Sequence, residues 1–161
     1  GKTNGWYQIL CNGRTGYVSA EFVVVQDNDT VTKPDGDGSD ISPNPLGQEI
    51  VEYALQYVGY PYVYGTAGPN TFDCSGFTYY VYSQFGYTLD QVKNGVAISK
   101  EDLQQGDLVF FSTNGQYPTH VGLYIGDNNI VHASTPQDGV KISSLDTSYY
   151  MDNYFAARRI L

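Results

Sequence analysis

The chain is poor in cysteine, histidine and basic residues. Its 161 residues include two cysteines, two histidines and 8 Lys or Arg against 17 Asp or Glu, which gives a formal net charge of −9. Binding to nucleic-acid phosphates needs a basic surface, so we expect no nucleic-acid partner. Cys11 and Cys74 lack the CxxC spacing of structural zinc sites, and we expect no metal or other cofactor. The sequence leaves open whether these two cysteines form a disulfide.

Long hydrophobic runs are also missing. No stretch approaches the roughly 20 apolar residues that a membrane-spanning helix needs, so we expect no membrane span. The chain starts at Gly1 without the pattern of a signal peptide, and we expect a mature or excised fragment. With 41% hydrophobic residues, it can still bury a core of its own.

Residues 1–25 have the pattern of short strands joined by tight turns. Two strand-like runs, Gly5–Leu10 and Thr15–Val18, flank an Asn-Gly pair, which is the strongest short-range signal for a hairpin. A third run covers Phe22–Val25. The segment is too short for a stable core, and it resembles the last strands of a bacterial SH3-like (SH3b) module. A generic hairpin that packs against the main domain would have the same turn chemistry.

Residues 26–45 predict a flexible acidic linker. They are rich in Asp, Gly, Ser and Pro, a composition that buries little apolar surface. The acidic run from Asp35 to Asp40 has neither the closing glutamate nor the flanking helices of a calcium loop. The main domain is therefore expected over residues 46–161.

Two helices are expected at the start of the main domain. The first has Pro45 at its first position and ends at Gly59. Its expected apolar face consists of Ile50, Val51, Ala54, Leu55 and Val58. The second opens at Cys74 and ends at Gly86, because apolar residues recur between them at helical spacing.

The rest of the domain has the pattern of strands. Candidate strands cover residues 106–111, 120–125, 130–134, 140–142 and 154–160. A turn at 126–129 joins the second and third of them. Two helices followed by an antiparallel meander give an α+β fold, in which helices pack on one face of a mainly antiparallel sheet.

Cys74 and the two histidines are a set of groups suited to nucleophilic catalysis. Unpaired N–H groups and the dipole at a helix start favour thiolate over thiol. A thiolate nucleophile needs a general base, and the base needs a third group to orient its ring. We therefore assign Cys74 as the nucleophile, His120 as the base and His132 as the orienting residue. Each histidine alone could equally be an ordinary strand residue.

The expected strand register conflicts with this assignment. With a two-residue turn at Asp127-Asn128, His132 lies opposite Leu123 and points to the other face from His120. A bulge, or a turn centred nearer Gly126, would be needed to bring the two rings together. The sequence leaves both possibilities open.

Asp73 and Ser75 flank the cysteine and make its surroundings polar. Asp73 can cap the helix, but its charge would also raise the pKa of the thiol. We therefore expect Asp73 to have a second role, the binding of a positively charged substrate amine.

Five segments together resemble one protein family. They are Pro61–Gly65, Phe72–Phe77, Gly106–Phe111, His120–Gly126 and His132–Ala133. Over about residues 46–161 the chain resembles the NlpC-type cell-wall cysteine peptidases. The resemblance implies a papain-like fold and the hydrolysis of peptidoglycan stem peptides or muropeptides, usually between D-γ-glutamate and the following diamino acid.

The resemblance also implies roles for six residues. The catalytic ones are Cys74, His120 and His132. Tyr62 is implied to help line the oxyanion site. Asp73 and Ser75 are implied to hold the free amine of the stem's N-terminal L-alanine. Lys93 stands where the family often has a serine that contacts substrate, which leaves the preferred stem peptide open.

We therefore expect a monomeric hydrolase that is secreted or associated with the cell wall. Two other functions remain open. A related acyltransferase would use the same three catalytic residues but transfer the acyl group to an amine or a lipid. A non-catalytic peptidoglycan-binding module would bind muropeptides and leave them intact.

Overall fold

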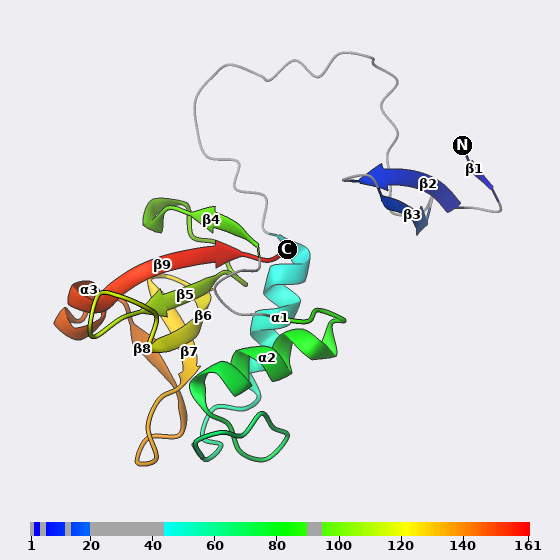
Figure 1. Cartoon of the computed structure of the whole chain (residues 1–161). Helices are drawn as coiled ribbons and strands as arrows, with labels where there is room; N and C mark the ends of the chain where they lie inside the picture. The colour runs from blue at the N-terminus through cyan, green and yellow to red at the C-terminus, as the bar shows by residue number, and fades with distance from the viewer. Residues whose placement is uncertain (1, 4–5, 12–13, 20–43, 90–94) are drawn as a thin grey trace. The chain divides into compact units, whose positions relative to one another are not determined.

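The computed structural model describes residues 2–3, 6–11, 14–19, 44–89 and 95–161 (Figure 1). The chain divides into two compact units, Gly1–Asp40 and Ile41–Leu161. The predicted strand at 22–25 and nearly all of the predicted linker lie outside the described residues, as does Lys93.

The first unit contains an antiparallel three-stranded sheet. Its strands are β1 (Lys2–Thr3), β2 (Trp6–Cys11) and β3 (Arg14–Ser19), in the order β1-β2-β3. Strands β2 and β3 pair antiparallel from Trp6 with Ser19 to Cys11 with Arg14. This pairing confirms the predicted hairpin.

The second unit combines helices with a six-stranded antiparallel sheet. The helices are α1 (Pro45–Leu55), α2 (Cys74–Gln84), the 3₁₀ turn η2 (Lys100–Asp102) and α3 (Ser148–Asn153). The strands are β4 (Val96–Ile98), β5 (Leu108–Phe111), β6 (His120–Gly126), β7 (Asn129–Ala133), β8 (Val140–Ser144) and β9 (Tyr154–Arg159), in the order β4-β9-β5-β6-β7-β8. This confirms the expected α+β class. In the described part of the chain, no helix has the length and apolar character needed to cross a membrane.

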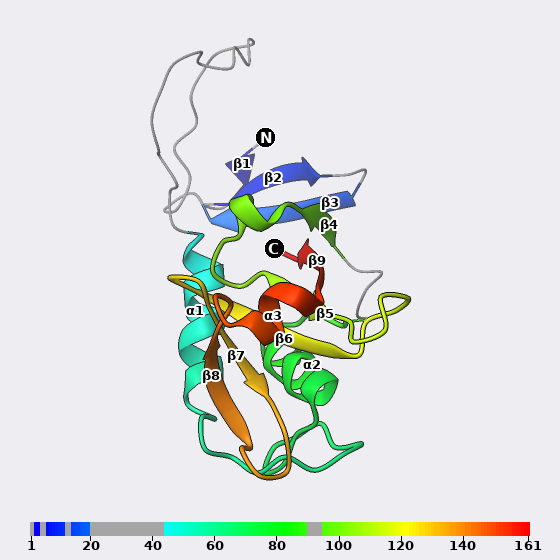
Figure 2. The same cartoon turned by 90° about the vertical axis from the view of Figure 1, so that its left-hand side faces the viewer.

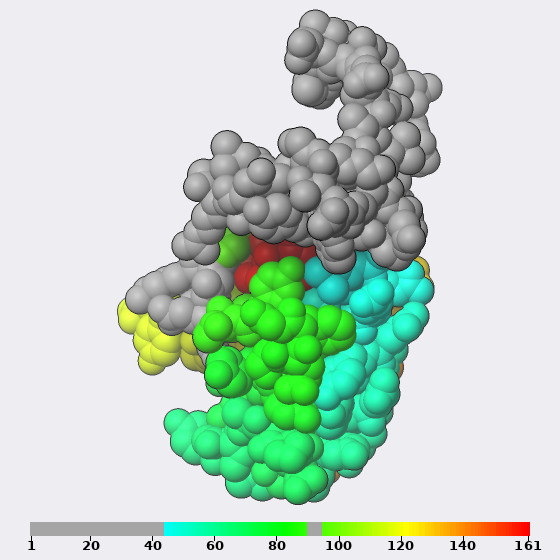
Figure 3. Space-filling model, turned by 90° about the vertical axis from the view of Figure 1, so that its right-hand side faces the viewer, coloured from blue at the N-terminus to red at the C-terminus, as the bar shows by residue number. Residues whose placement is uncertain are grey.

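Helices α1 and α2 lie side by side against one face of the sheet (Figures 1, 2 and 3). A hydrophobic core fills the space between them and the strands. It includes Ile50 and Ala54 of α1, Phe77 of α2, and Leu123 and Val131 of the sheet. These inward residues fix which face of β6 and β7 is turned toward the helices.

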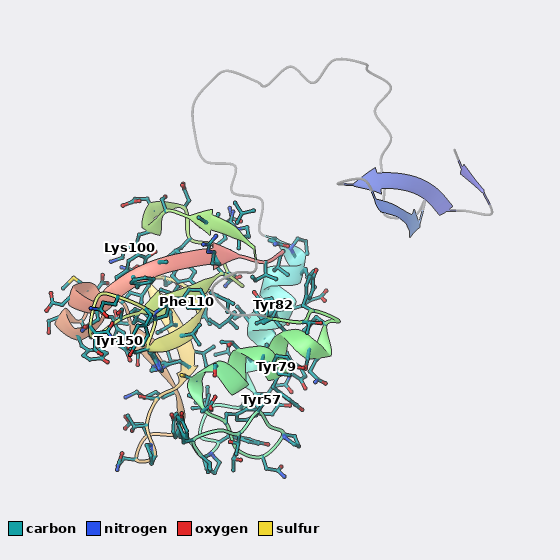
Figure 4. The ribbon with its side chains drawn as sticks, in the orientation of Figure 1. Tyr57, Tyr79, Tyr82, Lys100, Phe110 and Tyr150 are labelled. Carbon is teal, nitrogen blue, oxygen red and sulfur yellow. The ribbon has the colours of Figure 1, made fainter. Side chains whose placement is uncertain are left out.

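A smaller core lies on the other face of the sheet. It contains Val109, Phe111, Ile130 and Leu145, all buried. Tyr150 of α3 packs on this core, and the centroids of the Tyr150 and Phe111 rings are 5.0 Å apart. Figure 4 shows Tyr150 at the α3 end of the sheet, away from the helix α2 tyrosines. Neither α3 nor β4 was expected from the sequence.

Helix α1 ends at Leu55, four residues before the predicted stop at Gly59. Its last turn tightens into bonds between residues three apart, such as the one from the Tyr57 N–H to the Ala54 carbonyl. The Gly59 N–H instead donates to the carbonyl of Val140 at the start of β8. Of the expected apolar face, Ile50, Val51 and Ala54 are buried, whereas Leu55 and Val58 are 36% and 44% exposed.

Asp107 and Arg159 form an ion pair between the residue before β5 and the end of β9. Arg159 donates from Nε to Oδ1 (2.9 Å) and from Nη2 to Oδ2 (2.7 Å) of the carboxylate. The Gln104 N–H also donates to Oδ2 (2.8 Å), and Asp107 is only 1% exposed. Removing one partner would therefore leave the other charge unpaired, which is costly when that charge is buried.

We expect Arg159→Met to lower the free energy of unfolding by about 3–5 kcal/mol, because it leaves the buried Asp107 carboxylate without its cation. The control is Asp138→Asn, which breaks the exposed Asp138–Lys141 pair and should lower the free energy of unfolding far less than Arg159→Met does. Urea unfolding at neutral pH measures both. Similar small losses in the two variants would contradict the structural role of the buried pair.

Candidate active site

Asp73 fixes the start of helix α2. As the N-cap, it accepts hydrogen bonds from the Gly76 N–H (2.6 Å) and from the Ser75 hydroxyl (3.1 Å). Its other oxygen accepts from the Gly65 N–H (2.8 Å), which ties the loop before the helix to the cap. A side chain at Gly76 would collide with the carbonyl oxygen of Thr66, so this loop packs closely only against a glycine.

Cys74 is the first residue of α2, and its thiol is free. Burial raises the pKa of the thiol, and the charge of Asp73 raises it further. Backbone hydrogen bonds from Val121, Ser75 and Cys74 itself act in the opposite direction. The thiol is thus favoured over the thiolate in the resting protein, because desolvation outweighs the helix-start effect expected from the sequence.

A bulge in β6 resolves the register of the two histidines. Gly126 pairs with Asn129 across a two-residue turn, but the register shifts between Tyr124 and Gly126, so that Leu123 pairs with Val131. His132 therefore lies opposite Gly122, on the same face as His120. At Gly122, an added Cβ would lie 2.8 Å from Ile130 and 3.4 Å from the His132 Cβ. A side chain at position 122 would therefore crowd Ile130, which lies on the same face as the two rings.

The histidine rings are joined by a hydrogen bond of 2.7 Å between His120 Nε2 and His132 Nδ1. The other nitrogen of His132, Nε2, lies 2.9 Å from the Ser143 hydroxyl and 3.2 Å from the Tyr150 hydroxyl. His132 is completely buried. Both of its nitrogens therefore have a partner, and its ring is held on two sides.

Both histidines are neutral at physiological pH. Burial lowers the pKa of His120 to about 4. Burial also lowers the pKa of His132, to about 3, with smaller effects in the same direction from His120 and Lys141. The site therefore combines a protonated thiol with two neutral imidazoles, an arrangement that can transfer a proton without a resting ion pair.

Tyr62 lies near the cysteine, next to the loop that precedes α2. It forms an isolated bridge with Phe72. Its pKa is raised by burial first, and then by the nearby Cys74 and Asp73. A pocket of about 230 Å³ opens beside this region and is lined by Asp73 and Ser75, among others.

The structure thus brings the six predicted site residues into one region. Asp73 and Ser75 flank Cys74, Tyr62 lies near it, and the sulfur contacts the backbone of Val121, the residue after His120. Among the described residues, no group of three His, Cys, Asp or Glu side chains is placed to hold a metal ion.

Sequence reasoning missed Ser143 and Tyr150, the two hydroxyl partners of His132. Ser143 could have been found from the pairing of β7 with β8, because Ile130 pairs with Ser143 and alternation then puts its side chain on the His132 face. Tyr150 gave no signal, because it lies on the short α3 helix that the sequence did not predict.

Comparisons with known proteins agree with this architecture. The family model described as NlpC/P60 family matches residues 59–159. A γ-D-glutamyl-L-lysine dipeptidyl-peptidase from Bacillus cereus is 37% identical over 126 residues, which are 74% of this chain and 38% of that protein. A probable peptidoglycan endopeptidase, LytE, from Bacillus subtilis is 39% identical over 114 residues, covering 69% of this chain and 34% of that protein.

A solved structure has the same fold. The crystal structure of an NlpC/P60 family protein from Bacillus cereus superposes with a TM-score of 0.68 and 30% sequence identity, covering 100% of this chain and 52% of that one. The papain-like α+β fold is therefore shown for this chain. The chain spans about half of that solved chain and less than half of the two curated relatives.

Because both histidines stay neutral in the folded protein, acid should destabilise it. The unfolded chain takes up protons on each histidine below about pH 6.5, whereas the folded chain does so only near the lowered pKa values. Between about pH 7 and pH 5, each histidine should cost up to about 2 kcal/mol of stability. Urea unfolding at both pH values should show a shallower loss for His132→Asn than for the parent. Parallel losses in the two proteins would contradict the buried neutral pair.

Proposed function

Since the chain belongs to the NlpC/P60 family, we propose that it is a cell-wall hydrolase, a cysteine endopeptidase that acts on peptidoglycan stem peptides or muropeptides. The proposed cut is the bond between D-γ-glutamate and the following diamino acid. One observation carries the proposal. The Cys74 sulfur contacts the backbone of Val121, the residue after His120, and His120 is hydrogen-bonded to His132. The named γ-D-glutamyl activity of the Bacillus cereus relative supports the choice of bond.

The proposed proton path starts at the thiol. Cys74 gives its proton to Nδ1 of His120 as the sulfur attacks the scissile carbonyl carbon. Nε2 of His120 keeps its own proton and donates it in the hydrogen bond to His132 Nδ1. His132 must then carry its proton on Nε2, where the Ser143 hydroxyl accepts it. The Ser143 and Tyr150 hydroxyls can accept as well as donate, so they can pair with the tautomer of His132 that receives a bond from His120.

The leaving step uses the same base as an acid. His120 passes the proton to the departing amine as the C–N bond breaks, which leaves a thioester on Cys74. A water molecule, deprotonated by His120, then attacks the thioester and restores the thiol. Since burial lowers the pKa of His120 to about 4, its protonated form is a stronger acid than an ordinary imidazolium and gives up the proton more readily.

The oxyanion that forms on attack lies near the start of α2. Backbone N–H groups there, together with the Tyr62 hydroxyl, are the donors that we assign to it. One well-placed donor of this kind is typically worth about 2.7–4 kcal/mol in the transition state.

The pocket beside Asp73 is the proposed site for the free amine of the stem peptide. The Asp73 carboxylate already accepts bonds from Gly65, Ser75 and Gly76. Two carboxylate oxygens offer about four acceptor positions, so one remains for an ammonium group. The Ser75 hydroxyl also lines this pocket and can accept a second bond from the amine.

Two other functions compete with hydrolysis. An acyltransferase would use Cys74 and the histidines in the same first step, and ligated rather than hydrolysed products would identify it. A non-catalytic peptidoglycan-binding module would leave muropeptides intact. A buried His120–His132 hydrogen bond beside a free thiol favours chemistry over simple binding, because orienting a base serves no purpose in a binding module.

The remaining parts of the chain fit the same role. We assign residues 1–25 to a partial SH3b-like segment and residues 46–161 to the peptidase domain, with a linker over 26–45. We also propose that the protein is a monomer that is secreted or associated with the cell wall, where its substrate lies.

The proposed chemistry predicts that Cys74→Ala abolishes cleavage. Loss of the nucleophile should lower the rate by about 10⁴-fold or more, because no other group can form the thioester. Mass spectrometry of defined muropeptides after digestion measures the products. A Cys74→Ala protein that cleaves as fast as the parent would overturn the assignment.

The proposed amine site predicts that Asp73→Asn changes the KM for one of two stem peptides and not for the other. Asp73→Asn should raise the KM for a stem peptide with a free N-terminal amine about tenfold, because the ammonium loses its charged partner. The same variant should barely change the KM for the N-acetylated peptide, which offers no ammonium. Alkylation of Cys74 by iodoacetamide controls for an effect on the thiol. An equal KM in parent and variant for the free-amine peptide would remove Asp73 from substrate binding.

A further inference from the structure

A second cavity, of about 530 Å³, opens on the sheet face that carries the two histidines. His120 lines it together with Lys141, and every other residue that lines it bears a hydroxyl group. Ser143 and Tyr150, the partners of His132, are among them. The cavity is therefore lined by hydroxyl groups, by His120, which is the proposed general acid, and by one cation, Lys141.

Lys141 is the only Lys or Arg among the described residues that line this cavity. It pairs with His132 across β7 and β8, so both side chains project from the same face of the sheet. Its ammonium donates to Asp138 Oδ2 (2.8 Å), and its side chain is 39% exposed. An ammonium has three N–H donors, so two remain for a ligand.

The unit that holds this cavity is acidic, since residues 41–161 contain 11 Asp or Glu against 5 Lys or Arg, a formal net charge of −6. A substrate carboxylate is therefore repelled by most of the surface and needs a local cation to bind. Lys141 is such a cation, and the surrounding hydroxyls can donate further bonds to carboxylate oxygens.

We propose that this cavity receives the leaving part of the substrate and that Lys141 binds the free carboxylate of the residue after the scissile bond. This inference rests on the proposed function, in which His120 protonates the leaving amine. The leaving residue must then lie beside His120, and His120 lines this cavity. The enzyme should therefore prefer stem tripeptides, which end at that residue, over stems that continue or end in an amide.

Asp138 limits the preference for substrates with a free carboxylate after the scissile bond. Its carboxylate holds Lys141 and competes with the substrate carboxylate for the same ammonium. Its bonds from the hydroxyls of Thr135 (3.2 Å) and Ser134 (3.5 Å) fix it at the rim of the cavity. Removing its charge while keeping its shape should release Lys141 for the substrate.

The test compares two substrates, L-Ala-γ-D-Glu-L-Lys with a free carboxylate and the same tripeptide as its C-terminal amide. The measured quantity is the ratio of kcat/KM for the acid to kcat/KM for the amide. The parent should favour the acid about fivefold, the size expected of one partly exposed ion pair. Lys141→Gln should bring the ratio to about one, and Asp138→Asn should raise it above the parent's value.

Lys100→Gln is the matched control. Lys100 lies in η2 near β4, at the opposite edge of the sheet from β8, and its ammonium sits over the Tyr154 ring (Figure 4). The substitution Lys100→Gln removes one positive charge from the same domain, as Lys141→Gln does. The ratio of kcat/KM for the acid to kcat/KM for the amide should therefore stay at the parent's value.

The outcomes separate this inference from the proposed function. If the parent cleaves neither tripeptide, the proposed function fails. If the parent cleaves both but shows no preference, or if Lys141→Gln keeps the parent's ratio, the cavity does not bind the carboxylate and the hydrolase assignment stands. A fall in the ratio for Lys100→Gln equal to that for Lys141→Gln would mean that net charge, not this site, sets the preference.

Discussion

The site depends on one buried hydrogen bond, between His120 Nε2 and His132 Nδ1. Three features of the fold make it possible. The bulge between Tyr124 and Gly126 puts both rings on one face, Gly122 avoids the clash that a side chain there would make with Ile130, and the buried residues Phe111 and Ile130 pack on the same face. The bond therefore depends on the register and packing of the sheet as well as on the two histidines.

Burial then sets the protonation of every reacting group. It raises the pKa of Cys74 and lowers that of both histidines, so the resting site carries no ion pair. Attack must therefore create charge inside a poorly solvated site, where fixed donors act more strongly than in water. The Ser143 and Tyr150 hydroxyls hold His132 as that charge forms, and in the proposed mechanism the start of α2 and Tyr62 stabilise the oxyanion.

Much of the fold could be read from the sequence, because the turn residues and the apolar periods around Cys74 and along β5 to β9 are strong local signals. The strand register could not, since a single bulged residue at Ile125 reverses which face His132 occupies. The end of α1 was missed because residues 56–58 tighten into bonds between residues three apart, and Gly59 then bonds to Val140, far away in sequence. Tyr150 was missed for the same kind of reason, since only tertiary packing brings α3 to His132.

The most direct test of a neutral His120–His132 pair is the pH profile of kcat/KM for a defined stem tripeptide. In the proposed mechanism the base must be neutral to accept the proton of Cys74, so on the acid side activity falls where His120 becomes protonated. With the pKa of His120 near 4, the acid limb of the profile should lie near pH 4, and activity should be level through pH 6.5. An acid limb centred at about pH 6.5, the ordinary value for histidine, would contradict the account.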